Sequence, residues 1–157
     1  MRMSIKNLSR TVLGICTKLS WLGPLVVRLF VGVAFTLDGW GKVHNLDGVT
    51  SYFQDDLHIP LAHLNAVFVS WVELVAGVLL VLGLCTRIAA LFLIPTMVVA
   101  FLTAILPQLE STLDLFNKLE LTYVVIFIWL GLGGAGKASL DHLLFRRRAD
   151  PQVGEAA

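Results

Sequence analysis

Glu73 is an acidic residue inside an apolar run, residues 64–84, that reads LNAVFVSWVELVAGVLLVLGL. The run is about long enough to cross a bilayer as a helix, which takes roughly 20 residues. A carboxylate near the middle of such a helix costs at least about 2.5 kcal/mol on insertion, so it normally faces a protein interior and finds a partner. Glu73 therefore marks a position that matters for assembly or for chemistry.

Arg28 is the residue that we expect to partner Glu73, so that the two form a polar membrane core. Glu73 lies eleven residues from the end of its run, roughly 16 Å at 1.5 Å per residue, and an arginine reaching inward could close that gap. Three interpretations stay open. The pair is a structural ion pair, or it handles protons or a ligand, or Arg28 extends to the lipid headgroups and leaves Glu73 protonated.

Small residues share the helical stripes of these charges. The positions Arg28, Gly32, Gly39 and Lys42 fall on one side of a helix, and Gly77 follows Glu73 by one turn. Glycines on such a stripe allow another helix to approach closely. Gly32, Gly39 and Gly77 are therefore predicted helix-packing positions.

Histidines are a weaker signal. His44, His58 and His63 lie in one polar segment and could, with Asp55 or Asp56, bind a transition metal. Pro60 interrupts the segment and the spacing does not suit ligands one helical turn apart, so we expect no metal site there. No span contains a histidine, and the two cysteines of the chain cannot hold an iron–sulfur cluster alone. No tightly bound cofactor is expected, and no residue set indicates catalysis by the isolated chain; a quinone is the ligand left open.

Composition places these residues in a membrane. The chain has 157 residues, of which 57% are apolar and 15% charged, whereas soluble domains are about a quarter charged. Its net charge of +1 is not spread as a basic face, which argues against binding nucleic acid. We predict an all-α, membrane-embedded four-helix bundle. Its spans are approximately Leu22–Val43, Leu64–Leu84, Ile88–Leu106 and Leu119–Ala138.

Lysines and arginines set the predicted orientation. They gather before the first span, at the turn between the second and third spans, and after the fourth. The other loops are mainly acidic. The positive-inside rule then places both termini in the cytoplasm of a bacterium, with the chain in its inner membrane. Residues 1–20 form a basic segment that is either an amphipathic interfacial helix or a topology-setting tail, residues 21–144 the membrane domain, and residues 145–157 a cytoplasmic tail.

Two tryptophans lie deep within the spans. Trp71 and Trp129 could line an apolar quinone cleft, but we expect them to pack in the core of the bundle.

Four ordered segments resemble the DoxX family of small integral membrane proteins. They are RLFVGVAFTLDGWGK at 28–42, ELVAGVLLVLGLCTRIAA at 73–90, MVVA at 97–100 and GLGGAGKASLD at 131–141. The resemblance spans roughly residues 24–144. It implies a four-helix membrane fold with recurrent polar positions at Arg28, Lys42, Glu73, Arg87 and Asp141.

What the resemblance implies about function is broader. Some DoxX-like proteins are associated with thiosulfate oxidation that uses quinone as acceptor, and others with redox-stress complexes or metal handling. We expect a redox-associated membrane subunit that contacts quinone or an oxidoreductase partner in a membrane complex. A non-enzymatic assembly or metal-stress protein and a small proton-coupled transporter are the alternatives, and a homo-oligomer is left open.

Overall fold

The computed structural model describes residues 13–14, 17–108, 118–136 and 138–146, and all regular structure within them is helical. The predicted all-α class is therefore confirmed. Of the basic segment 1–20, most lies outside the described residues, as does the tail beyond Arg146.

Three helices are long and apolar enough to cross a membrane. Helix α2 (Leu22–His44) continues a helical run that starts at Thr17, α4 spans Ala62–Leu82, and α5 (Thr86–Ala100) runs on into the π-helical η2 (Phe101–Ile105) and the short 3-10 helix η3 (Leu106–Gln108). These helices match the first three predicted spans within a few residues. A three-residue turn joins α4 to α5, as the sequence predicts for a tight antiparallel hairpin.

The fourth apolar helix is shorter than predicted. Helix α6 (Leu119–Gly133) has 15 residues, about 22 Å of helix, whereas the predicted span extends to Ala138. Two glycines explain the early end, because Gly134 and Gly136 adopt positive φ values of 77° and 76° that a right-handed helix does not use. A short helix, α7 (Leu140–Arg146), follows this break.

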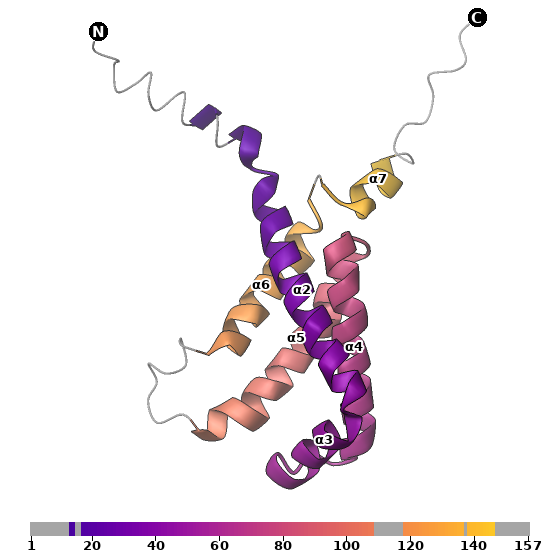
Figure 1. Ribbon diagram of the computed structural model, residues 1–157. Coiled ribbons are helices and arrows are strands. Elements are labelled where there is room, and N and C mark those ends of the chain that lie inside the picture. The colour runs from indigo at the N-terminus through magenta and orange to yellow at the C-terminus, as the bar shows by residue number, and fades with distance from the viewer. Residues whose placement is uncertain (1–12, 15–16, 109–117, 137, 147–157) are drawn as a thin grey trace, which may run out of the picture.

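The segment between the first two spans is also helical, although the sequence predicts only a polar loop. Helix α3 (Leu46–Ser51) leads into a π-helical turn, η1 (Tyr52–Asp56). His58 and Leu61, with φ near +50°, then redirect the chain into α4. Figure 1 shows α3 at one end of the molecule and α7 at the other.

Close packing of α2 against α4 depends on the predicted glycines. A Cβ atom on Gly39 would collide with the backbone at Leu74, one on Gly77 would lie 2.5 Å from the Thr36 nitrogen, and one on Gly32 would lie 2.8 Å from the Val81 nitrogen. The two helices cross in Figure 1 at this contact, and α5 lies against α6. The core between the helices includes Val31, Phe35, Leu80, Leu93, Phe127 and Leu130, all buried.

Large apolar side chains cover much of the outer surface. Phe30, Leu37 and Leu91 each expose about two thirds of their surface, at 68%, 67% and 66%. A soluble monomer rarely presents so much contiguous apolar area, whereas lipid tails accept it without cost. This surface agrees with a membrane-embedded chain.

Candidate functional site: a buried ion pair facing a cavity

Glu73 pairs with Lys42. Its carboxylate is 1% exposed, and its Oε2 lies 2.5 Å from the Nζ of Lys42 in the last turn of α2. The side chain of Lys42 can reach Glu73 because side chains lean toward the N-terminus of their helix, which carries this ammonium from the end of α2 back toward the middle of the bundle. The close contact at Gly39, one turn before Lys42, brings the two helices together at this level.

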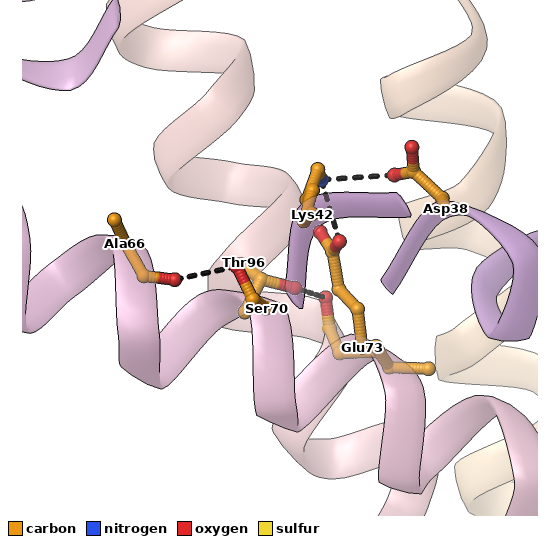
Figure 2. A network of polar contacts seen from close by, with 7 residues as sticks. Asp38, Lys42, Ala66, Ser70, Glu73 and Thr96 are labelled. Carbon is orange, nitrogen blue, oxygen red and sulfur yellow. Dashed lines mark hydrogen bonds and ion pairs between the residues drawn. The ribbon is translucent and has the colours of Figure 1, made fainter. Parts of the chain in front are cut away.

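Asp38 is the third member of this group, and it was not among the residues predicted from the sequence. Its Oδ2 lies 2.8 Å from the Nζ of Lys42, so that the ammonium lies between two carboxylates (Figure 2). The spacing of Asp38 and Lys42 was the available signal, because residues four apart on a helix are neighbours on its surface. We call Asp38, Lys42 and Glu73 the ion triad.

A cavity of about 850 Å³ opens beside the ion triad, and all three residues contribute to its lining. The cavity lies toward the α3 end of the molecule. Its wall comes from α2, the α3–η1 segment, the first half of α4, the last part of α5 with η2, and the first turns of α6. Most of the wall is apolar, so the triad is a polar patch inside a hydrophobic chamber.

Aromatic rings line one side of this chamber. Phe35 and Tyr123 contact each other edge to face with ring centroids 5.1 Å apart, and both line the cavity. Phe127 contacts Phe35 in the same way at 5.0 Å and is fully buried behind it. These ring contacts pack α6 against α2 beside the cavity.

Arg28 does not pair with Glu73, so that expectation is wrong. Arg28 is buried, with 2% exposed, but it donates to the carbonyl oxygens of Ala135 at 2.7 Å and Ala138 at 2.9 Å. The reason is the direction of its side chain: on α2 it leans toward the N-terminus of the helix, away from Glu73. The antiparallel contact of α2 with α4 places Arg28 beside Gly83, ten residues beyond Glu73.

Asp141 holds the same end of the molecule together. Its two carboxylate oxygens accept hydrogen bonds from the backbone nitrogens of Cys85 at 2.7 Å and Thr86 at 3.1 Å, so it caps α5 from a distant part of the chain. The Asp141 nitrogen donates to the Gly83 oxygen at 2.9 Å. Arg87 is exposed and donates to the Leu132 oxygen over a long distance, 3.4 Å. Arg28 therefore ties the segment after α6 to α2, and Asp141 ties the same segment to the α4–α5 turn.

The histidines of the outer segment do not converge. His44 contacts the Trp40 oxygen at 2.9 Å, His58 the Gln54 oxygen at 3.1 Å, and His63 the Thr50 hydroxyl at 3.3 Å. Within the part of the chain that the structure describes, no three residues of metal-binding type form a group. The weak metal hypothesis for His44, His58 and His63 has no support from this geometry.

Trp71 and Trp129 do not pack in the core, contrary to expectation. They are 50% and 46% exposed, and Trp71 lines an apolar groove of about 780 Å³ on the outer face of α4 and α5. This groove carries no charged side chain and is separate from the ion triad.

Comparison with known proteins agrees with this architecture. The family model for DoxX matches residues 23–106, which include the ion triad and the α4–α5 hairpin. The protein named "Putative oxidoreductase CatD" of Bacillus subtilis is 27% identical over 134 residues, covering 84% of this chain and 94% of that protein. The "Inner membrane protein YqjF" of Escherichia coli is 31% identical over 133 residues, covering 83% of this chain and 98% of that protein. An uncharacterised membrane protein of Mycobacterium tuberculosis is also 31% identical, over 78% of this chain and 82% of its own length.

No solved structure matches the chain. The family model covers more than half of the sequence, and the relatives are matched over nearly their whole lengths. With the spanning helices and the glycine-mediated contact of α2 and α4, these matches establish that the chain is a membrane protein of the DoxX family.

Proposed function

We propose that this protein is a redox-associated subunit that binds the headgroup of a membrane quinone beside the ion triad. The observation that carries the proposal is the placement of Asp38, Lys42 and Glu73 on the wall of a mostly apolar cavity within the span region. Ligand sites are usually apolar chambers of about 300–1,000 Å³ with a few convergent polar groups, and this cavity fits both criteria.

The chemistry of a quinone suits the two parts of the chamber. Its ring oxygens require hydrogen-bonding partners, and its ring and tail require apolar surroundings. Lys42 uses two of its three N–H donors on Asp38 and Glu73, which leaves one donor for a ligand. Phe35 and Tyr123 offer flat apolar surface nearby.

A redox reaction of the bound quinone needs a source of electrons, which the proposal assigns to a partner protein. In the described part of the chain no group of three histidine, cysteine or acidic residues could hold a metal ion. The proposal therefore places an oxidoreductase partner beside this protein, and the name of the Bacillus subtilis relative agrees with a redox setting.

The proposal also includes an inner-membrane location with both termini in the cytoplasm. Its support is the path of the chain after α6, because Ala135, Ala138 and Asp141 contact the start of α2 and the α4–α5 turn. If α6 crosses the membrane with the help of its flanking residues, the basic ends and Arg87 lie on one side, as the positive-inside rule requires. The Escherichia coli relative is named as an inner-membrane protein.

The test is purification of the full chain with its native lipids, followed by extraction and identification of bound quinone. We expect quinone to co-purify and Val99→Trp, which adds bulk to the cavity wall, to lower its amount. Val98→Trp is the matched control, since Val98 is the neighbouring residue and does not line the cavity. Equal retention by both variants would contradict a quinone site in this chamber.

The buried carboxylate of Glu73 favours a second function, that of a small proton-coupled transporter. A carboxylate at this depth is typical of proton relays in transporters. Reconstituted vesicles separate the two functions: ligand-driven proton movement by the chain alone, abolished by Glu73→Gln, would favour transport over quinone binding.

A further inference from the structure

The apolar groove on the outer face of α4 and α5 follows from the sizes of the residues along these two helices. Ala76 on α4 and Ala89 on α5 both line the groove and are buried, with 4% and 2% of their surface exposed. The lining also contains larger side chains that are about half exposed, namely Trp71, Val75, Ile88 and Phe92. Small residues beside large ones therefore leave a groove that opens toward lipid.

The groove is long in the direction of the helices. Its lining on α4 extends from Leu64 to Leu79, which is about 22 Å of helix at 1.5 Å per residue. This length is more than half of the hydrocarbon core of a bilayer, which is about 30 Å thick. A long, flexible apolar chain that lies beside α4 suits this shape, whereas a compact ligand would fill only part of the groove.

The groove adjoins the cavity of the ion triad at Phe68. This residue of α4 lines both the cavity and the groove. Its side chain is 58% exposed, so it is not held within the packed core. A ligand whose polar end lies beside the ion triad therefore has an apolar path out of the cavity, past Phe68 and along α4.

We propose that the groove holds the isoprenoid tail of the quinone whose ring binds in the cavity, so that the substrate class is a long-tailed membrane quinone. The inference rests on the proposed function and adds the part of the ligand that lies outside the cavity. A cavity of about 850 Å³ is of the size that encloses a drug-sized molecule. A ring with a long tail exceeds this size, so the tail must leave the cavity.

The tail gains from packing in the groove. Lipid tails are as apolar as the groove itself, so no hydrophobic driving force moves the tail from the bilayer onto the protein. The groove instead offers dispersion contacts with side chains on two packed helices, each weak and additive only in number. We therefore expect the groove to tighten binding several-fold and not by orders of magnitude.

The experiment measures binding of two quinones with the same ring to the purified full chain in lipid nanodiscs. One is trimethyl-1,4-benzoquinone, which has no tail, and the other carries a tetraprenyl tail at the remaining ring position. Empty nanodiscs are measured in parallel and subtracted, which removes the contribution of partition into lipid. Each variant is compared with the unchanged protein for the same ligand.

Val75→Trp adds bulk to the groove at a half-exposed position, so the chain should fold. It should weaken binding of the tetraprenyl quinone about fivefold and leave the tail-less quinone unchanged, because the ring lies in the cavity. Val78→Trp is the matched control, since Val78 is also exposed on α4 and lines neither the cavity nor the groove. It should change neither affinity, whereas Val99→Trp in the cavity wall should weaken both.

Photolabelling locates the tail without any substitution. A tetraprenyl quinone with a diazirine at the end of its tail should label peptides that contain Trp71, Leu79 or Phe92, and excess unlabelled tetraprenyl quinone should remove the label. Phe30, on the outer surface of α2 and 68% exposed, is the reference for contact with free lipid. Equal labelling at Phe30 and in the groove would show that the tail moves freely in the bilayer, and the inference would be wrong.

The outcomes separate this inference from the proposed function. If Val75→Trp leaves binding of the tetraprenyl quinone unchanged, or weakens both quinones equally, the groove does not hold the tail. The quinone site in the cavity still stands in that case, provided that Val99→Trp weakens binding of the tail-less ring. If neither quinone binds above the level of empty nanodiscs, the quinone proposal itself is wrong, and the inference about the groove is wrong with it.

Discussion

At the scale of single residues, a buried carboxylate is stabilised by a partner from a neighbouring helix. Glu73 is 1% exposed and contacts Lys42, which also contacts Asp38. Arg28 instead donates hydrogen bonds to the carbonyl oxygens of Ala135 and Ala138. The chain thus has two separate polar clusters. The ion triad faces a cavity, and Arg28 links α2 to the segment after α6.

This separation predicts the outcome of two double-mutant cycles. Removing one partner of a buried ion pair costs about 3–5 kcal/mol, so Glu73→Ala and Lys42→Ala should each lower the free energy of unfolding by an amount of this order. Their effects should be less than additive in combination, since the pair is lost only once. Arg28→Ala with Glu73→Ala is the control cycle: the two groups share no partner, and their effects should add within about 0.5 kcal/mol. Unfolding in mixed micelles measures both cycles.

Coupling between Arg28 and Glu73 as strong as that between Lys42 and Glu73 would contradict the arrangement described above. Glu73→Gln serves as the conservative variant, because it keeps the volume and a hydrogen-bond acceptor near Lys42.

At the scale of helices, glycines set the distance between α2 and α4, and that distance lets the ion pair form. The Gly39 position has no room for a Cβ atom against the backbone at Leu74 and Glu73. Gly41, two residues further along α2, has no atom within 4 Å of where its Cβ would be. The two glycines therefore differ in role, although both stand in the same run of sequence.

We expect Gly39→Ala to destabilise the protein by about 1–3 kcal/mol, the usual cost of overpacking a tight contact. Gly41→Ala should be neutral or stabilising by up to about 1 kcal/mol, because alanine is the better helix former. Thermal unfolding in detergent compares the two. Equal destabilisation by both substitutions would show that helix flexibility, and not the helix contact, explains the requirement for glycine.

Capping of α5 by Asp141 gives a second prediction for a helix. Asp141→Ala removes the acceptor for the nitrogens of Cys85 and Thr86 and should cost about 1 kcal/mol, whereas Asn, which also accepts at such positions, should retain most of the stability. Hydrogen exchange at residues 85–87 should rise in the Ala variant. His142→Ala, at an exposed neighbouring position, is the control. Unchanged exchange would mean that solvent or other groups cap α5 equally well.

At the scale of the whole molecule, the apolar outer surface and the three long helices place the chain in a membrane. The number of passes depends on α6, whose 15 residues fall short of the usual span. The contacts of the segment after α6 with the start of α2 favour its return to the side where α2 begins.

Reporter fusions decide this topology. Fusions at residues 50 and 112 should report a periplasmic location, and one at residue 157 a cytoplasmic location, because an even number of passes brings the chain back to its starting side. A fusion within the N-terminal segment is the internal reference. A periplasmic C-terminus would show that α6 does not cross the membrane.

The sequence by itself determined the all-α class, the first three spans and the helical stripes that carry the glycines. Runs of apolar residues can be read without tertiary information, since burial of about 20 residues in lipid depends on composition and length. The positions of Gly32, Gly39 and Gly77 in the α2–α4 contact follow from helical periodicity. Glu73 also stood out, because a carboxylate within an apolar span raises the free energy of membrane insertion.

Only the tertiary structure decided which charge Glu73 contacts. Arg28 and Lys42 lie on the same stripe, and the choice between them depends on the register of α2 against α4 and on the lean of each side chain toward the start of its helix. The cavity depended on tertiary structure for the same reason. Its wall combines residues from several distant segments, including the α3–η1 segment that the sequence suggested was a loop, and no local pattern encodes the space that such segments leave between them.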